Sequence, residues 1–290
     1  MPYARVGVVT GANKGVGNAI VRQLALQYPK SRLNSGPFLI YLTARDQTRG
    51  EEALESLRQD PQLSQAGALS SAGGLSEIKF HSLDIASSGS INAFKEFIKK
   101  EHPEGIDLLI NNAGIAMQGF DTNVVKTTLR CNYYGTLEMV NTFLPLMKPL
   151  PTSRIVNVAS ISGALDKYSP QLVERFRAAR TVADSTALME DFTDAVIRGK
   201  EKDEGWPSAA YAVSKAGVIA MTGAVAAAEA QKDNGVVINS CCPGWVVTDM
   251  TRGKGVKTPD QGAQTPVMLA FGDDGGQTGL FWRDEKVLDW

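Results

Sequence analysis

Histidine is scarce in this sequence, whose 290 residues include only His81 and His102. A catalytic triad built around histidine, or a histidine-rich metal site, therefore has almost no material to draw on. We expect no metal centre. We also expect any acid–base chemistry to rest on other side chains.

Cysteine is nearly as rare, with Cys131, Cys241 and Cys242 as the complete set. An odd number that includes an adjacent pair is a poor basis for a disulfide framework, and the chain has no Asn-x-Ser/Thr glycosylation sequon. The first apolar run, residues 6–9, is too short for a signal sequence or a membrane-spanning helix. We predict a cytoplasmic protein with no membrane partner.

An excess of either charge is also missing, since 30 Lys and Arg stand against 31 Asp and Glu. The formal net charge of −1 provides no general attraction for nucleic acid or for an anionic membrane, and we expect neither partner. Hydrophobic residues make up 43% and charged residues 21%, values typical of soluble globular domains. The chain can therefore build a core of useful size.

Short apolar runs alternate with amphipathic stretches along most of the chain. The runs at residues 6–9, 38–43, 78–83, 106–110, 155–158 and 236–241 are nearly continuous in Val, Ile and Leu, which is typical of strands in a parallel sheet covered on both faces. The stretches at 16–28, 47–58, 90–101, 122–147 and 209–232 predict helices. This alternation predicts an α/β fold, a doubly wound parallel sheet of the Rossmann type.

Two segments interrupt the alternation. Residues 61–76 are rich in Ser, Gly and Ala, which predicts a flexible surface loop. Residues 164–206 predict a helical insertion: Ser169 and Pro170 open a short helix, and a second helix ends at Gly199. No linker divides the chain, so we predict a single domain over residues 1–290 with an insertion at about 164–206.

Glycines 11, 15 and 17 lie between the first predicted strand and the first predicted helix. Glycine permits a tight turn there and lets backbone N–H groups approach a pyrophosphate, which faces the positive end of the helix. At the start of a β-α-β unit this pattern predicts a dinucleotide-binding loop. A purely structural turn is the alternative interpretation.

Further motifs follow the glycine loop, each at the end of a predicted strand or on a predicted helix. In chain order the set is Thr10-Gly11-x-x-x-Gly15-x-Gly17, Asn111-Asn112-Ala113-Gly114, Ser160, Tyr211-x-x-x-Lys215 and Pro243-Gly244. Together they resemble the short-chain dehydrogenase/reductase family over essentially the whole chain. Residues 44–49, 204–208 and 241–250, and the long segment between Ser160 and Tyr211, are similar to the monomeric carbonyl reductases of that family.

The resemblance implies an NADP(H) cofactor, and the residues at the end of the second strand agree with it. An acidic side chain at that position would repel a 2′-phosphate, but the strand leads into Arg45, whose planar guanidinium suits a phosphate, and Lys14 in the glycine loop adds a second cation. Asp46 points away from the cofactor in the resembling enzymes. The alternative is that both cations are ordinary surface charges. The implied cofactor-binding residues are Gly11, Asn13, Lys14, Gly15, Val16, Gly17, Arg45, Asp84, Ile85, Asn112, Ala113, Gly114, Tyr211, Lys215, Pro243, Val247 and Thr248.

Tyr211 and Lys215 are four residues apart on a predicted helix, so they share one face, and Ser160 ends a strand at the edge where open α/β sheets bind ligands. By resemblance, Ser160 orients a carbonyl oxygen and Tyr211 protonates it. Lys215 would lower the pKa of the phenol and hold the nicotinamide ribose, and Asn132 would position a water. The predicted substrate-binding residues are Ser160, Ile161, Trp206, Tyr211, Trp245 and Met250, although tryptophans in such loops can equally be core anchors.

These features predict NADPH-dependent reduction of an aldehyde, ketone or quinone by a monomeric enzyme. Two alternatives remain: a non-catalytic NADP-binding regulator on the same fold, and an alcohol dehydrogenase working in the oxidative direction. Ser160, Tyr211 and Lys215 are all present, which disfavours the first alternative. The two cations beside the predicted cofactor site disfavour an NAD-dependent form of the second. The sequence names no physiological substrate.

Overall fold

A computed structural model describes residues 3–232, 235–272 and 275–290. Its centre is a sheet in which the described strands follow the order β3-β2-β1-β4-β5-β6-β7-β8. Strands β1 to β7 pair in parallel, and β8 pairs antiparallel with β7. The strands are β1 (Arg5–Val9), β2 (Phe38–Ala44), β3 (Ser76–Ser82), β4 (Leu108–Asn111), β5 (Arg154–Val158), β6 (Val237–Cys242), β7 (Phe281–Arg283) and β8 (Lys286–Val287).

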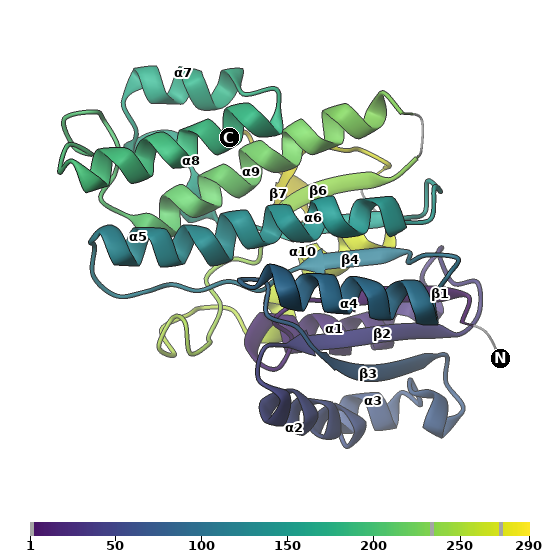
Figure 1. Cartoon of the computed structure of the whole chain (residues 1–290). Coiled ribbons are helices and arrows are strands. Elements are labelled where there is room, and N and C mark those ends of the chain that lie inside the picture. Colours follow the sequence, from purple (N-terminus) through teal and green to yellow (C-terminus); the bar gives the residue numbers. More distant parts are fainter. Residues whose placement is uncertain (1–2, 233–234, 273–274) are drawn as a thin grey trace.

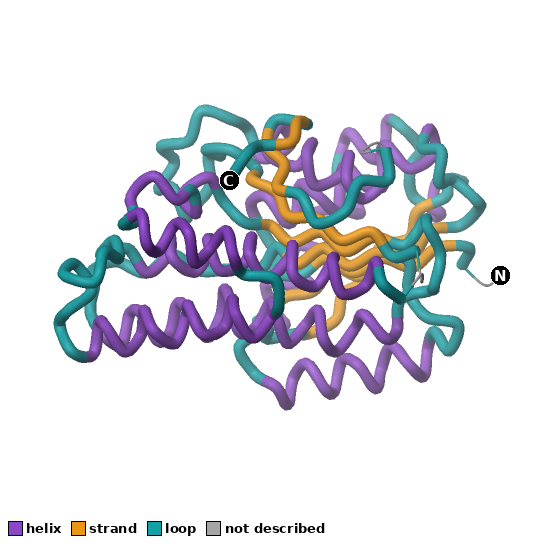
Figure 2. The backbone as a smooth tube through the Cα atoms, turned by 90° about the horizontal axis from the view of Figure 1, so that it is seen from above, coloured by secondary structure: helices purple, strands orange, loops and turns teal. Residues whose placement is uncertain are grey.

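Helices cover both faces of the sheet (Figures 1 and 2). The described α-helices are α1 (Gly15–Gln27), α2 (Gln47–Arg58), α3 (Pro61–Gln65), α4 (Ser88–Glu101), α5 (Thr122–Leu129), α6 (Thr136–Phe143), α7 (Pro170–Ala178), α8 (Val182–Ile197), α9 (Ala210–Ala230) and α10 (Pro259–Phe271). Successive strand residues face opposite sides, so Val8 joins the core under α4, α5, α6 and α9, whereas Val9 joins the core under α1, α2 and α10. The doubly wound parallel sheet predicted from the sequence is confirmed.

The prediction of a flexible surface loop over residues 61–76 is wrong. Asp60 accepts hydrogen bonds from the backbone N–H groups of Gln62 and Leu63, and Pro61 occupies the first turn, so helix α3 begins there. Leu63 and Leu69 are buried in the core. The Ser, Gly and Ala content of this segment concealed a cap and its two buried leucines.

The stretch predicted as one helix over 122–147 is divided. A π-helical turn, η3 (Arg130–Gly135), separates α5 from α6, and a 3-10 turn, η4 (Leu144–Leu146), follows α6. Helix α10 and strands β7 and β8 were not predicted from the sequence. Pro266 inside α10 masks its helical pattern, and strands of two or three residues are too short to show a period.

The predicted helical insertion is present as α7 and α8. Ser169 caps α7, and Thr181 with Asp184 forms a capping box at the start of α8. Helix α8 packs against α5 and α9, with Leu188, Met189 and Phe192 in the core. Figure 1 shows α7 and α8 stacked beside α9. The insertion therefore covers the outer side of the helix that carries Tyr211.

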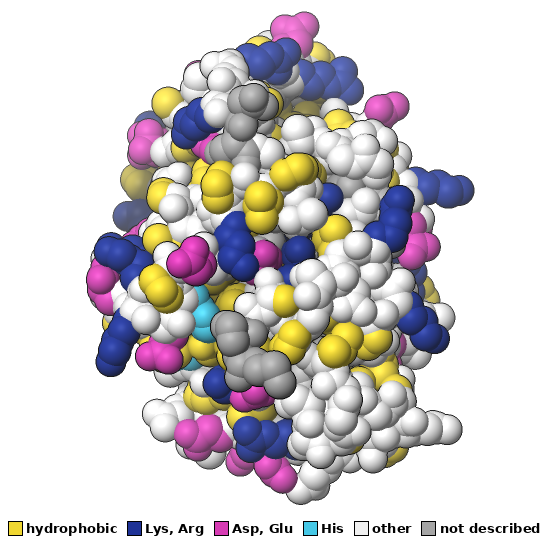
Figure 3. All heavy atoms as spheres, turned by 90° about the vertical axis from the view of Figure 1, so that its right-hand side faces the viewer, with side chains coloured by type: hydrophobic (Ala, Val, Ile, Leu, Met, Phe, Trp, Pro, Cys, Tyr) yellow, Lys and Arg dark blue, Asp and Glu magenta, His cyan; other side chains and the backbone are white. Residues whose placement is uncertain are grey.

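Helix α9 is also the one described helix that is long and apolar enough to cross a membrane by length and composition, but 78% of the relevant window is buried inside the protein. The apolar side chains of α9 therefore pack in the protein core. Figure 3 shows the face at the amino ends of the strands, where basic and acidic side chains are interspersed.

Candidate active site

The glycine loop between β1 and α1 lies against the segment that follows β4. Gly11 has φ +62°, and a Cβ placed there would lie 2.7 Å from the Ala113 Cα. A Cβ on Gly17 would lie 2.4 Å from the Asn112 Nδ2. Side chains are therefore excluded at both glycines, because the loop packs directly against the segment that follows β4.

Thr10 and Asn112 fasten these two segments together. The Thr10 Oγ1 accepts hydrogen bonds from the Asn112 N–H and the Ala113 N–H, both at 3.0 Å, and the Asn112 Nδ2 donates to the Thr10 carbonyl at 2.9 Å. The sequence motif begins with Thr10, but its spacing gave no role for the threonine side chain.

Arg45 is exposed directly after β2, and the Ala12 N–H joins the glycine loop to the Thr43 carbonyl at 2.9 Å. Asp46 caps α2 by accepting a hydrogen bond from the Arg49 N–H at 2.9 Å. The carboxylate of Asp46 is therefore directed to its own helix, in line with the sequence-based expectation.

Residues 243–258, named here the strap, connect β6 to α10 and touch the glycine loop. A Cβ on Gly15 would lie 3.2 Å from the Thr248 Cγ2, and the Lys14 Nζ lies 2.6 Å from an Asp249 carboxylate oxygen. The ion pair between Lys14 and Asp249 was not foreseen. Residues so far apart in the chain give no sequence signal of such a contact.

Ser160 and Tyr211 form the centre of the site. Ser160 follows β5 and caps the 3-10 turn η5 (Ile161–Gly163), and its Oγ accepts a hydrogen bond from the Ser162 N–H at 3.1 Å. The Ser160 side chain lies close enough to the Tyr211 phenol to lower its pKa as a hydrogen-bond partner. The predicted pair is therefore assembled, although the residues come from a strand end and a distant helix.

Burial raises the pKa of Tyr211 to about 12, and the hydrogen bond from Ser160 opposes that shift. The sequence led us to expect a phenol pKa lowered by Lys215. In this structure burial outweighs the favourable contacts, so the phenol firmly retains its proton.

Lys215 lies one helical turn beyond Tyr211 and is only 4% exposed. Its Nζ donates to the Val158 carbonyl at 2.7 Å and stands 5.7 Å from the centre of the Tyr211 ring. Burial lowers the pKa of Lys215 to about 8, because the low-polarity surroundings disfavour the charged form. A cation beside the phenol is therefore available near neutral pH.

Asn132 occupies the π-helical turn and is fully buried. Its Oδ1 accepts from the Ile115 N–H at 2.8 Å, and its Nδ2 donates to the Ile115 carbonyl at 2.9 Å and to the Ser214 Oγ at 3.0 Å. A Cβ on Gly114 would lie 3.2 Å from the Asn132 Oδ1 and 3.5 Å from the Lys215 Nζ. Asn132 and Lys215 thus border the same glycine, and π turns of this kind are frequent at functional sites.

The turn η5 is pressed against α9. A Cβ on Gly163 would lie 2.6 Å from the Ala216 N and 2.8 Å from the Lys215 carbonyl carbon. On the other side, the Trp290 Nε1 donates to the Gly163 carbonyl at 2.7 Å. Gly163 and Trp290 were missed by the sequence analysis, and both set the position of the turn that carries Ser160.

The predicted substrate residues separate into two groups. Ile161 is half-buried beside Ser160, and Trp245 and Met250 project from the strap with 55% and 47% exposure. Trp206 is instead 3% exposed. It packs against Tyr168, Phe176 and Phe192 under the insertion. The packing of Trp206 corresponds to the core-anchor interpretation rather than to a wall of the site at Tyr211.

The remaining predicted cofactor residues line the same edge of the sheet. Asn13, Val16 and Pro243 are half-buried, and Val247 is exposed on the strap. Ile85 is buried in the core, and the Asp84 carboxylate accepts a hydrogen bond from the Ala86 N–H at 2.9 Å. A group of three or more His, Cys, Asp or Glu side chains that could hold a metal ion is absent from the described residues.

Residues 5–172 and 197–258 match the short chain dehydrogenase family, and the chain belongs to this family. The unmatched residues 173–196 contain most of α7 and α8, so the insertion is an addition to the family's common fold.

Several named proteins are similar to this chain over nearly its whole length. Carbonyl reductase (NADPH) 1 of Homo sapiens is 40% identical, with 98% of each chain covered, and carbonyl reductase (NADPH) 3 of Rattus norvegicus is 40% identical, with 99% of each chain covered. The structure of salutaridine reductase from Papaver somniferum superimposes with a TM-score of 0.80 at 27% identity, covering 96% of this chain and 99% of that one.

Proposed function

We propose that this chain reduces carbonyl groups with NADPH, using Ser160, Tyr211 and Lys215. One observation carries the proposal: Ser160 and Tyr211 lie next to each other beside the buried Lys215, at the sheet edge where the glycine loop also lies. NADPH-dependent carbonyl reduction is the activity named for its full-length relatives, and it is the function of this chain.

The residues present fit the cofactor. The glycine loop packs closely against the segment after β4 and leads into the positive end of α1, where backbone N–H groups can face a pyrophosphate. Lys14 and Arg45 provide the positive charge that a 2′-phosphate needs, and Lys215 lies close to Gly114 where a ribose would pass. NADPH, when bound there, supplies the hydride for the carbonyl carbon.

The protein's own side chains handle the carbonyl oxygen. Ser160 donates a hydrogen bond that polarises the carbonyl, and Tyr211 transfers its phenolic proton to the oxygen as negative charge develops there. The neighbouring ammonium of Lys215 stabilises the phenolate that remains. Because the pKa of Tyr211 is raised to about 12, the acid form predominates throughout the physiological range.

In the reverse direction the same three residues would act on an alcohol, whose hydroxyl would give its proton to the Tyr211 phenolate. The direction of the reaction therefore depends on the supply of reduced cofactor. A non-catalytic NADP-binding role is disfavoured because Ser160, Tyr211 and Lys215 are all present and lie together in the structure. For the substrate class, we propose aldehydes, ketones and quinones held between Ile161 and the exposed Trp245 and Met250 of the strap.

We further propose that residues 1–290 act as one domain, that the protein is a monomer and that it works in the cytoplasm. The packing of α8 over α5 and α9 supports the monomer. In the resembling family the helix equivalent to α9 commonly forms the dimer interface, and here the insertion occupies that surface.

The replacement Tyr211→Phe tests the proposed proton donor. It removes the phenolic oxygen and retains the ring, so NADPH binding should persist while kcat falls by about a hundredfold or more, the usual contribution of general acid catalysis. NADPH affinity is measured by fluorescence, and kcat is measured by NADPH absorbance with a panel of aldehydes, diketones and quinones. A variant that keeps more than about a tenth of the wild-type kcat would show that Tyr211 is not the donor.

A further inference from the structure

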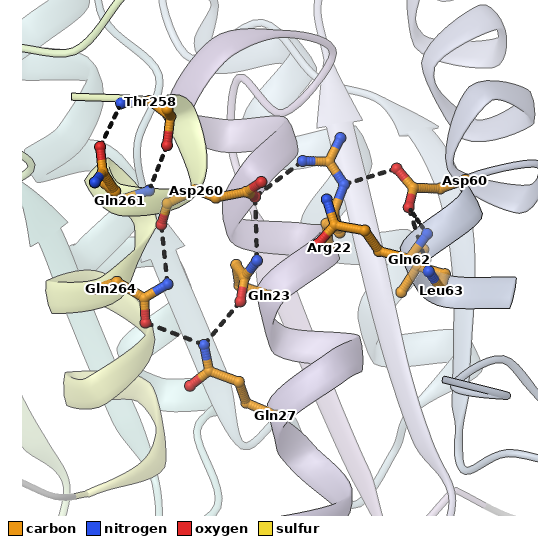
Figure 4. A network of polar contacts seen from close by, with 10 residues as sticks. All are labelled: Arg22, Gln23, Gln27, Asp60, Gln62, Leu63, Thr258, Asp260, Gln261 and Gln264. Carbon is orange, nitrogen blue, oxygen red and sulfur yellow. Dashed lines mark hydrogen bonds and ion pairs between the residues drawn. The ribbon is translucent and has the colours of Figure 1, made fainter. Parts of the chain in front are cut away.

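The strap is held differently at its α10 end and at its tip, which lies at Asp249. At its α10 end, Thr258 and Gln261 form a capping box, and the Asp260 carboxylate accepts hydrogen bonds from Arg22 at 2.9 Å and Gln23 at 3.1 Å on α1 (Figure 4). Arg22 also bonds to Asp60 at 2.8 Å and is mostly shielded from solvent. This end of the strap is therefore firmly fixed to α1.

In the described part of the chain, an exposed ion pair joins the tip of the strap, at Asp249, to the start of α1. Lys14, which stands at the N-cap position of α1, pairs with Asp249 at 2.6 Å, and the two side chains are 60% and 78% exposed. An ion pair that open to solvent contributes little stability, so it can be exchanged readily. The contrast with the shielded Asp260 network marks Asp249 as the releasable contact of the strap.

Lys14 also lies where the cofactor's phosphate is expected. It is part of the glycine loop, which the Ala12 N–H joins to the end of β2, two residues before Arg45. A phosphate monoester carries about 1.5 to 2 negative charges and three acceptor oxygens, whereas the Asp249 carboxylate carries one charge and two oxygens. A phosphate placed between Lys14 and Arg45 should therefore displace Asp249.

We propose that Asp249 is a specificity-determining residue that competes with the cofactor's 2′-phosphate for Lys14, so that NADPH binding releases the tip of the strap. The inference rests on the proposed cofactor site. NADH has no 2′-phosphate and leaves the Lys14–Asp249 pair intact. Asp249 thus tempers the affinity for NADPH and links cofactor binding to the strap that carries Trp245 and Met250.

A double-mutant cycle measured by cofactor binding tests this competition. The proteins are wild type, Asp249→Asn, Lys14→Met and the double variant, and the dissociation constants for NADPH and NADH are measured by fluorescence titration without turnover. Asp249→Asn should tighten NADPH binding by about twofold to fivefold, the range expected when an exposed competing ion pair is removed. NADH binding should be unchanged. In the Lys14→Met background the Asp249→Asn change should have no effect on either cofactor.

Asp203→Asn is the matched control, because Lys200 and Asp203 form an ion pair of similar exposure on the surface of the insertion. It removes the same charge and should leave both dissociation constants unchanged. Weaker NADPH binding in Asp249→Asn would overturn the inference, since Asp249 would then hold the strap over the cofactor. Equal tightening with and without Lys14 would overturn it as well, as a general charge effect. Failure of the wild type to bind NADPH would instead contradict the proposed function.

Discussion

The catalytic position of Lys215 lowers the stability of the folded protein. Its ammonium is buried, and the pKa of Lys215 is lowered to about 8 from an ordinary 10.5. Below pH 8 the side chain is charged in both the folded and the unfolded chain, so the folded protein bears the full cost of the buried charge, on the order of 3 kcal/mol. Between pH 8 and 10.5 the unfolded chain binds more protons, and the stability of the wild type rises with pH.

We predict that Lys215→Met stabilises the cofactor-free protein at pH 7 while abolishing most of its turnover. The gain should be about 1–3 kcal/mol, because the loss of the hydrogen bond to Val158 offsets part of the relieved cost. The gain should shrink between pH 8 and 10.5. Urea unfolding at a series of pH values measures it, with the exposed Lys167→Met as the control. A loss of stability at pH 7 would contradict the prediction.

Among single residues, the sequence identified those whose position in a motif indicates their role. Tyr211 and Lys215 were found because a helical spacing of four residues is visible in one dimension. The contact between Lys14 and Asp249 joins residues 235 positions apart, so nothing in the sequence indicates it. Trp206 was ambiguous for the same reason, since a tryptophan in a loop can enter a pocket or a core, and only the packing decides.

The position of the short turn η5 relative to α9 is the element-scale feature on which the site depends. Because a Cβ at position 163 would collide with the backbone at residues 215 and 216, we predict that Gly163→Ala pushes η5 away from α9 and separates Ser160 from Tyr211. The expected result is a fall in kcat of about tenfold or more, with a smaller change in NADPH affinity. Steady-state kinetics and fluorescence titration measure the two quantities.

Gly89→Ala is a suitable control for Gly163→Ala. Its nearest neighbour, the Ser87 Oγ, would be 3.9 Å from the new Cβ, which is ordinary contact, and it lies on α4 away from Ser160. The control should keep wild-type kcat. If Gly163→Ala did the same, η5 would not need its close approach to α9.

Long, regular elements were predicted well, and irregular ones were not. The predicted helix over residues 47–58 coincides with α2. The π turn η3 was invisible because a single widened turn leaves the apolar period of α5 and α6 nearly intact. The start of α10 did carry a signal in the sequence, because Thr258 and Gln261 form a capping box and Pro259 is a first-turn proline. Pro266 obscured the helical pattern of the residues that follow.

For the whole molecule we predict a monomer in solution. Helix α8 approaches α9 so closely that a Cβ on Gly217 would lie 2.6 Å from the Met189 Sδ, which leaves no room for a helix of a second subunit. Light scattering at micromolar concentration should give the mass of one chain, 31.1 kDa. A stable dimer or tetramer would contradict the prediction.

The fold class and the family were predicted from the sequence and are confirmed. Both depend on features repeated along the chain, namely buried strands and motifs in a fixed order, so local errors such as the missed α10 do not alter them. The substrate class depends on how the exposed Trp245 and Met250 of the strap surround a ligand, which sequence spacing does not determine.

The two edge strands of the sheet, β3 and β8, bear on aggregation. An edge strand presents unpaired backbone groups to any other chain, and charged side chains discourage such pairing. At one end, Leu69 bridges to Ser76, the first residue of β3, and β3 continues with Glu77 and Lys79. At the other end, β8 is only two residues long and exposes Lys286. Neither edge offers a long apolar template, so we expect concentrated solutions of the folded protein to resist strand-mediated assembly into fibres.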